Sequence, residues 1–363
     1  MAFWNKTFVA RMETGAIIGG LRIEEIAFGG AGVGRSDGKV VFVPFTIEEE
    51  VVDVRVVESR RSFDLGRLVT IRESSEHRVV APCPFFQDCG GCDYQHITYT
   101  HQLVIKQKQI AQALARIAKL SGFEVKPVVP SPKSFGFRNR IVVHCDQDKI
   151  GFFKKQSRTI VDIPQCLIAS NAVNTKLRQF RASRPRPGTH STIRERDDVA
   201  TFSQTNDGVG ALLLEFVRAQ VEGAVVLDAY CGAGFFAHEL AESVEKVIGI
   251  DWSEPAIRRA RQLANTNETY LCGDAGELLD AILGKEKPST IILDPSATGI
   301  SEGVVAALTS RPPPKLIYVS CNSATFARDI HRLSPAFRLK IVQPFDMFPQ
   351  TAEIEAVGVL EPS

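Results

Sequence analysis

The sequence predicts an α/β protein in three parts, with a doubly wound parallel sheet in the C-terminal part. Strand-like apolar runs alternate with helical segments from residue 204 onward, and short strands with glycine and proline turns fill the first 74 residues. A cysteine-containing, basic segment lies between them. A chain of 363 residues exceeds what one core usually holds. We therefore expect three domains, covering residues 1–74, 75–203 and 204–363.

The N-terminal part predicts a small β-barrel. Its runs "KVVFVPF", "EVVDVRVVES" and "LGRLVTIRE" are rich in β-branched residues and are separated by turn residues. Several short strands in so few residues are typical of an OB-type barrel, a fold that often binds oligonucleotides. Residues 1–74 carry 10 Lys and Arg against 11 Asp and Glu. This near-neutral balance confines any RNA contact to one face of the barrel.

Charge is distributed unevenly over the other two parts. Residues 75–203 carry 20 basic against 10 acidic side chains, and residues 204–363 carry 13 against 21. A basic segment beside an acidic one indicates a polyanion held by one part and chemistry done by the other, with solvated surface charge as the alternative. No long apolar run or signal-peptide pattern is present. We therefore expect a cytoplasmic protein, reduced thiols, no membrane span and, by default, a monomer.

The C-terminal part predicts a ligand site at the carboxyl ends of its strands. Four of the strand-like runs end in an acidic residue: Asp228, Asp251, Asp274 and Asp294. The run "DAYCGAGFF" places Gly232 and Gly234 in the first turn, but it lacks the G-x-G-x-x-G pattern of dinucleotide sites. A ligand with adenosine and no phosphates, S-adenosylmethionine, fits this turn better. Helix N-capping is the alternative role of the four aspartates.

Cys321 and two glutamates predict the chemistry. Cys321 lies in "LIYVSCNSATFARD", just past the fifth strand, and Glu353 and Glu355 lie in "DMFPQTAEIEAVGVL". A thiolate and a carboxylate beside a methyl donor suit methylation at C5 of a pyrimidine. The thiolate adds at C6, C5 takes the methyl group, and a base then removes the C5 proton. Cys231 and Cys272 are instead expected to be small buried side chains.

The segment "CPFFQDCGGCDYQH", residues 83–96, contains Cys83, Cys89 and Cys92. Three reduced thiols make an incomplete four-ligand site. Zinc sites usually combine two close cysteine pairs, so three cysteines and one distant ligand favour a [4Fe–4S] cluster. Zinc and buried thiols remain alternatives. The fourth ligand has two candidates, Cys166 in "VDIPQCLIAS" and Cys145, which lies in an apolar strand and is more simply a core residue.

Several motifs together resemble the S-adenosylmethionine-dependent RNA uracil-5 methyltransferases, in particular their iron–sulfur 23S rRNA branch. The cysteine segment is similar to the family's C-x5-C-G-G-C-x2-Q-H, "FSQTN" to F-x-Q-x-N and "LDAYCGAG" to D-x-[FY]-C-G-x-G. "SCNSATFARD" is similar to S-C-N-P-x-T-x-A-R-D, and "FPQTAEIEAV" to F-P-x-T-x-H-x-E-x-V. The resemblance covers nearly the whole chain, and residues 10–74 look like a TRAM domain.

The resemblance implies roles at the matching positions. Cys321 is implied as the nucleophile, Glu355 as the base that takes the C5 proton, and Cys166 as the fourth cluster ligand. Phe202 is implied to pack on a flipped target base. Further positions are implied to line the cofactor and base pocket: Gln204, Tyr230, Gly232, Asp251, Asp274 and Asp294. The implied substrate is 23S rRNA. Transfer RNA at position 54 and a catalytically decayed RNA-binding module are the alternatives.

Three positions depart from the family pattern. Ala297 stands where the family has the arginine of D-P-P-R, Ser323 where it has a proline, and Glu353 where it has a histidine. Because the proposed nucleophile and base persist, we expect activity, with altered substrate choice or slow turnover as the consequence of the changes. Glu353 beside Glu355 is expected to raise the pKa of one of the two carboxyls through like-charge repulsion.

Overall fold

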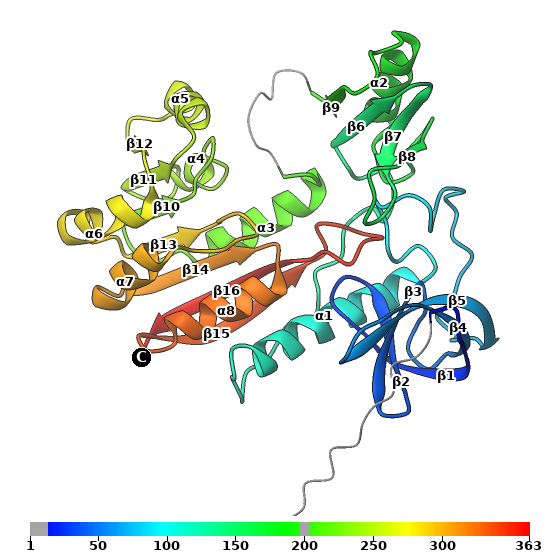
Figure 1. The fold of residues 1–363 in the computed structure, drawn as a ribbon. Helices are drawn as coiled ribbons and strands as arrows, with labels where there is room; N and C mark the ends of the chain where they lie inside the picture. Colours follow the sequence, from blue (N-terminus) through cyan, green and yellow to red (C-terminus); the bar gives the residue numbers. More distant parts are fainter. Residues whose placement is uncertain (1–13, 197–203) are drawn as a thin grey trace, which may run out of the picture.

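The computed structural model describes residues 14–196 and 204–363. They form three sheets, which Figure 1 shows as a barrel, a small sheet and a larger sheet with helices on both faces. No helix in the described ranges is both long and apolar enough to span a membrane. The three-part α/β architecture expected from the sequence is confirmed, and the domain boundaries after residues 74 and 203 stay predictions.

The N-terminal strands close into a five-stranded barrel of order β1-β2-β3-β5-β4. Alternate side chains fill its interior, among them Val41, Val52 and Val54, none of which is exposed. Gly66 is required there, because an added Cβ would lie 2.2 Å from Cγ1 of Val54. The strands are β1 (Ile17–Ile26), β2 (Ala31–Ser36), β3 (Lys39–Pro44), β4 (Val51–Ser59) and β5 (Phe63–Glu73). The predicted OB-like barrel is therefore confirmed.

The middle of the chain contains a long helix and a four-stranded antiparallel sheet of order β8-β7-β6-β9. Helix α2 covers one face of this sheet, with Val173 and Leu177 packed against Ile141 and Val143. The elements are α1 (Tyr99–Arg116), β6 (Arg140–Asp146), β7 (Lys149–Phe153), β8 (Ile160–Asp162), α2 (Asn171–Ala182) and β9 (His190–Arg194). The small apolar core between sheet and helix also includes Cys145, as expected.

The C-terminal sheet has seven strands in the order β12-β11-β10-β13-β14-β16-β15. Strands β10 to β14 are parallel, and β16 runs antiparallel to both of its neighbours. The strands are β10 (Val225–Ala229), β11 (Lys246–Asp251), β12 (Glu268–Cys272), β13 (Thr290–Leu293), β14 (Lys315–Ser320), β15 (Phe337–Phe345) and β16 (Glu355–Pro362). The helices are α3 (Asp207–Gln220), α4 (Ala237–Leu240), α5 (Glu254–Leu263), α6 (Ala275–Glu286), α7 (Glu302–Ser310) and α8 (Ser323–Leu333).

Helices on both faces explain why the parallel strands are continuously apolar. Every residue of β13 and β14 is buried, as expected for strands covered on two sides. Two large apolar clusters, one on each face, form the core. The strand order reverses between β10 and β13. The carboxyl ends of these two strands therefore border the crevice in which such sheets bind ligands.

Helix α1 joins the middle segment to the C-terminal core. Its residues Ile110 and Leu114 pack into the same apolar cluster as strands β10, β13 and β14. A lysine in a helix is usually exposed, but one lysine of α1 is not. Lys106 is completely buried, and its Nζ donates to Oδ1 of Asp346 at 2.5 Å and to the carbonyl of Phe348 at 3.0 Å. A buried partner carboxylate, invisible to helical periodicity, makes this burial possible.

Candidate active site and cysteine-lined cavity

Cys321 directly follows strand β14, and Glu355 begins the neighbouring strand β16. Strand β14 pairs with β16 antiparallel, with Ser320 opposite Ala356. The next position along each strand places Cys321 opposite Glu355, a separation of about 5 Å between Cα atoms in such pairs. Asn322 then caps α8 by accepting from the backbone N–H groups of the next turn. Tertiary pairing thus joins the two residues that the chemistry needs.

The charges of Glu355, Asp294 and Glu353 all act on the Cys321 thiol. Asp294 directly follows β13, the neighbour of β14, and burial raises its pKa to about 7. Burial also raises the pKa of Glu355 well above its usual value, and Asp294 and then Glu353 add to that rise. The pKa of Cys321 rises to about 12 through burial and the charges of Glu355 and Asp294. Glu353 thus acts on its neighbour in the expected direction, but burial and Asp294 have larger effects.

The glycine turn after β10 is shaped for close approach of a ligand. Gly232 has a φ of +55°, and an added Cβ there would meet nothing within 4 Å. Its N–H donates to Oδ2 of Asp251 at 2.9 Å, while Oδ1 of Asp251 accepts from the N–H of Ser253. Tyr230 has a φ of +69°, a rare conformation for a non-glycine residue that recurs at functional sites. The open turn and the carboxylate next to it fit an adenosine-containing ligand.

The other predicted pocket residues occupy different settings. Gln204 is buried, and its carbonyl accepts from Nδ2 of Asn139. Asp274 is exposed and caps α6, accepting from the N–H of Gly276 at 2.8 Å. The capping alternative is therefore real for this residue, although burial and the charge of Asp274 both raise the pKa of Tyr230, to about 12. Phe202 lies outside the described residues.

The structure explains one of the three departures from the family pattern, the serine at position 323. Ser323 is the first residue of α8, a position that favours proline but makes no demand for it, because the N–H there has no partner inside the helix. The backbone carbonyl of Ala297 accepts a hydrogen bond from Oγ1 of Thr325 at 2.9 Å, which connects this turn to α8. Nothing in the structure explains why Glu353, which is exposed, replaces a histidine.

Three further residues lie in settings that the sequence did not reveal. Asp228 is completely buried, and its Oδ2 accepts from the N–H of Ala237, which ties β10 to the start of α4. Trp252, directly after Asp251, is 77% exposed. Sequence reasoning assigned it no role, although its position next to the predicted ribose ligand was visible in the sequence. Cys272 is exposed and not buried as expected, because it lies at the end of β12.

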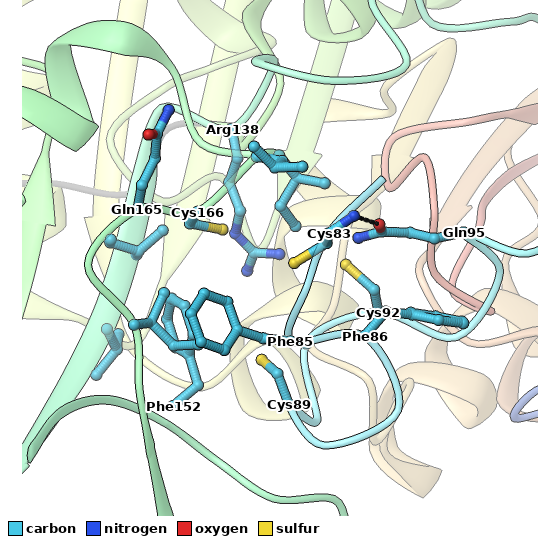
Figure 2. Close-up of a pocket in the computed structure, with 16 residues that line it drawn as sticks. Cys83, Phe85, Phe86, Cys89, Cys92, Gln95, Arg138, Phe152, Gln165 and Cys166 are labelled. Atoms are coloured by element: carbon cyan, nitrogen blue, oxygen red, sulfur yellow. Dashed lines mark hydrogen bonds between the residues drawn. The ribbon is translucent and has the colours of Figure 1, made fainter. Parts of the chain in front are cut away.

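The four cysteines predicted as cluster ligands line one cavity of about 210 Å³. Figure 2 shows the side chains of Cys83, Cys89 and Cys92 on one side of it and that of Cys166 on the other. The charges of the other three thiols all raise the pKa of Cys92, after the larger effect of burial. The thiols therefore lie close enough to act on one another, whereas Cys145 is buried in the strand core.

The cavity is framed by elements from two segments. The N–H of Gly90 donates to the carbonyl of Phe153 at 2.9 Å, which fixes the cysteine loop on the end of β7. Asn174 of α2 holds Cys166 through two hydrogen bonds. Its Nδ2 donates to the carbonyl of Cys166, and its Oδ1 accepts from the N–H of Cys166. Figure 2 shows the Arg138 side chain extending between Cys166 and Cys83. This cation lowers the pKa of Cys166, against the larger effect of burial.

The sulfur arrangement distinguishes between kinds of metal centre. Zinc requires its sulfur ligands about 2.3 Å from a single ion. Among the described residues, no three Cys, His, Asp or Glu side chains converge closely enough to hold a metal ion. Four thiols that surround an open cavity, with an arginine to balance thiolate charge, are the donor set that a multi-iron cluster uses.

The fold and the crevice define a methyltransferase of the Rossmann-like class. A general methyltransferase domain model matches residues 220–295, and the tRNA (Uracil-5-)-methyltransferase model matches residues 276–362. The TRAM domain model matches residues 21–69, within the barrel.

Relatives that match most of the chain extend this comparison. An RNA methyltransferase of Bdellovibrio bacteriovorus is 31% identical, with 94% of each chain covered. One of Halalkalibacterium halodurans is 27% identical, covering 93% of this chain and 96% of its own. The crystal structure of Pyrococcus abyssi tRNA (uracil-54, C5)-methyltransferase with S-adenosyl-L-homocysteine has a TM-score of 0.74 at 26% identity, covering 94% of this chain and all of its own. This chain belongs to the RNA (uracil-5-)-methyltransferase family and carries a TRAM domain.

Proposed function

We propose that the protein methylates C5 of a specific uridine, with Cys321 as nucleophile and Glu355 as the base. The pairing of β14 with β16, which sets these two residues opposite each other beside Asp294, carries the proposal. S-adenosylmethionine, when bound, supplies the electrophilic methyl group. Its binding here is supported by the open turn at Gly232, by Asp251, and by the methyltransferase fold.

The residues of the site then divide the chemistry. The Cys321 sulfur adds to C6 of the uracil ring and thereby makes C5 nucleophilic. Because the thiol pKa is about 12 in the free site, the proton must pass to a base as the S–C6 bond forms. The Asp294 carboxylate, whose charge acts on Cys321, accepts it and returns it to the thiolate at the end of the cycle. Once C5 carries the methyl group, Glu355 accepts the C5 proton, and loss of the thiolate restores the double bond. Burial of Glu355 favours this role, because a raised pKa makes a carboxylate a stronger base.

We further propose that Cys83, Cys89, Cys92 and Cys166 hold a [4Fe–4S] cluster. The cavity that all four thiols line, together with Arg138, supports it. Anaerobically purified protein should contain about four iron and four sulfide per chain and be brown. Cys166→Ala should lose the iron and the colour, and Cys145→Ala should keep both. A colourless protein that contains zinc would overturn this assignment.

The substrate we propose is 23S rRNA, with transfer RNA at position 54 as the second candidate. The TRAM domain and the cysteine motif, which resembles that of the 23S rRNA branch, favour ribosomal RNA. The structural likeness to the Pyrococcus abyssi enzyme, which acts on uracil 54 of tRNA, favours the second candidate.

Tritium release tests both the chemistry and the substrate. Transcripts of 23S rRNA fragments and of transfer RNA, labelled with [5-³H]uridine, are incubated with protein and S-adenosylmethionine. Release from only one of them supports C5 methylation and selects the substrate. If neither transcript releases tritium while cofactor binding is intact, C5 methylation of free RNA is wrong. Cys321→Ala, which should bind the cofactor and release nothing, is the control.

A further inference from the structure

The face of the small sheet opposite α2 is exposed to solvent. Ile141 and Val143 of β6 point toward α2, so the alternate residues of that strand point the other way. One of them, Val142, is 44% exposed. Strand register places residues of β9 and β7 on the same face. We call this set the platform: Arg140, Val142, His144, Phe153, His190, Thr192 and Arg194.

One end of the platform is aromatic. The rings of His144 and Phe153 stack with centroids 4.0 Å apart and planes 26° apart, and the ring of His190 lies 6.0 Å from His144. His190 is exposed, and the other two are partly so. Burial and the neighbouring His190 lower the pKa of His144, so its imidazole is neutral near pH 7. The aromatic end presents flat rings, the kind of surface on which nucleobases stack.

The other end of the platform is cationic. Arg140 and Arg194 are direct partners across β6 and β9. The pKa of Arg140 is lowered by burial, and then by the like charges of Arg138 and Arg194. Guanidinium groups that repel one another are stabilised when a phosphate lies between them, because it accepts hydrogen bonds from both. The two ends of the platform thus suit the two parts of a nucleotide.

The cationic end lies next in sequence to a contact with Gln204, one of the predicted pocket residues. Asn139, the residue before β6, donates from Nδ2 to the carbonyl of Gln204 at 2.8 Å and to Oδ1 of Asp207 at 2.5 Å. The aromatic end lies four residues further along β6, about 13 Å away at the usual rise of a strand. A strand of RNA that leaves the target pocket therefore meets the arginines first and the rings next.

We propose that the platform binds the single-stranded RNA next to the target uridine, with bases stacked on His144, Phe153 and His190 and phosphate held by Arg140 and Arg194. The proposal rests on the function proposed above and adds a position and a chemistry to RNA binding. A protein partner fits less well, because rings and arginines on an open sheet match the alternating bases and phosphates of a single strand.

Fluorescence anisotropy with a fluorescein-labelled oligouridine of about twelve nucleotides tests the proposal. His144→Ala should weaken binding about tenfold, and His144→Phe should largely restore it, since the ring stacks without charge. Arg194→Gln should weaken binding and reduce the slope of log affinity against log salt by about 0.7 per lost phosphate contact. The control Arg258→Gln, on the exposed face of α5, should change neither quantity.

Two outcomes would overturn the platform. One is oligouridine affinity unchanged in both His144→Ala and Arg194→Gln. The other is a blunt RNA duplex that binds as tightly as the single strand and whose affinity falls by the same factor in His144→Ala. Paired bases cannot stack on the rings, so this result would exclude stacking. Cofactor affinity and thermal unfolding show whether each variant is folded. Should His144→Ala not fold, crosslinking of 4-thiouridine RNA to the wild type decides, since the platform requires crosslinks within residues 140–153 or 190–194.

Failure of the platform and failure of the proposed function are separate results. Tritium release by the wild type with unchanged RNA affinity in the platform variants refutes the platform and leaves C5 methylation standing. Loss of oligouridine affinity in the variants, with no tritium release from any transcript by the wild type, refutes C5 methylation and leaves the platform standing.

Discussion

Oδ2 of Asp93 accepts a hydrogen bond from the backbone N–H of Ala352 at 3.1 Å, across 259 residues of sequence. Asp93 follows the third cysteine of the cavity, and Ala352 lies three residues before Glu355. The backbone N–H groups of Asp93 and Tyr94 both donate to the carbonyl of Gln350 at 2.9 Å. The cysteine loop therefore holds the loop that leads to the proposed base, and the two sites share one support.

Removing that support should slow catalysis. Asp93→Ala deletes the acceptor for Ala352 and the ion pair with Lys155. We expect the single-turnover methylation rate to fall about tenfold, the equivalent of one charge-assisted hydrogen bond, with little change in cofactor affinity. Asp88→Ala is the matched control, since its ion pair with Lys154 lies on the surface of the same loop. Equal rates in both variants would show that the contact does not position the base.

Glu355→Gln should trap a covalent complex. Without a carboxylate to accept the C5 proton, the bond between Cys321 and C6 cannot be released after methyl transfer. Denaturing gels should show an RNA–protein band of reduced mobility, which Cys321→Ala combined with Glu355→Gln should abolish. Turnover should fall by at least about a hundredfold. A Glu355→Gln enzyme that turns over normally, without the shifted band, would assign the base to another residue.

Cofactor affinity should depend on pH because of Asp294. Its pKa of about 7 in the free site means that most molecules hold a proton there at pH 6 and few at pH 8. A sulfonium cation favours the ionised carboxylate, so binding releases a proton and tightens as pH rises. Below pH 7 the affinity should increase by up to about tenfold per pH unit and then level off.

S-adenosylhomocysteine, which has a neutral sulfur, should show a flatter profile than S-adenosylmethionine. Calorimetry in buffers of different ionisation enthalpy measures the proton release directly. Asp294→Asn should flatten the profile of the cationic ligand. Parallel profiles for the two ligands in the wild type would mean that Asp294 does not sense the sulfonium charge.

The buried ion pair between Lys106 and Asp346 should be costly to break from one side. Lys106→Met leaves the Asp346 carboxylate buried without its cation, which should lower the free energy of unfolding by about 3–5 kcal/mol. Lys106→Met with Asp346→Asn should recover much of that loss. Lys108→Met, an exposed position on the same helix, is the control. Denaturant unfolding measures the free energy of unfolding of each variant. If Lys106→Met lowers it no more than Lys108→Met does, the buried pair is not stabilising.

Much of the fold was predictable because local patterns report local surroundings. Alternating β-branched residues predicted the barrel, and apolar runs ending in aspartate predicted strands β10 to β13 and the edge at which they end. The cysteine spacing likewise predicted three of the residues that line the cavity. Helix α1 shows the limit of this approach. Its residue Lys106 is buried because it pairs with Asp346 on a distant segment, and the pattern of the helix does not report that partner.

Local sequence specifies which elements form, the glycine turn, and the kinds of side chain available for the chemistry. Long-range packing specifies that Cys321 faces Glu355, that Asp93 holds Ala352, and that a lysine on α1 is buried. Each of these depends on segments that meet across long stretches of chain, 240 residues for Lys106 and Asp346. Periodicity describes a residue's own strand or helix, whereas its partner is fixed by packing that no short segment encodes.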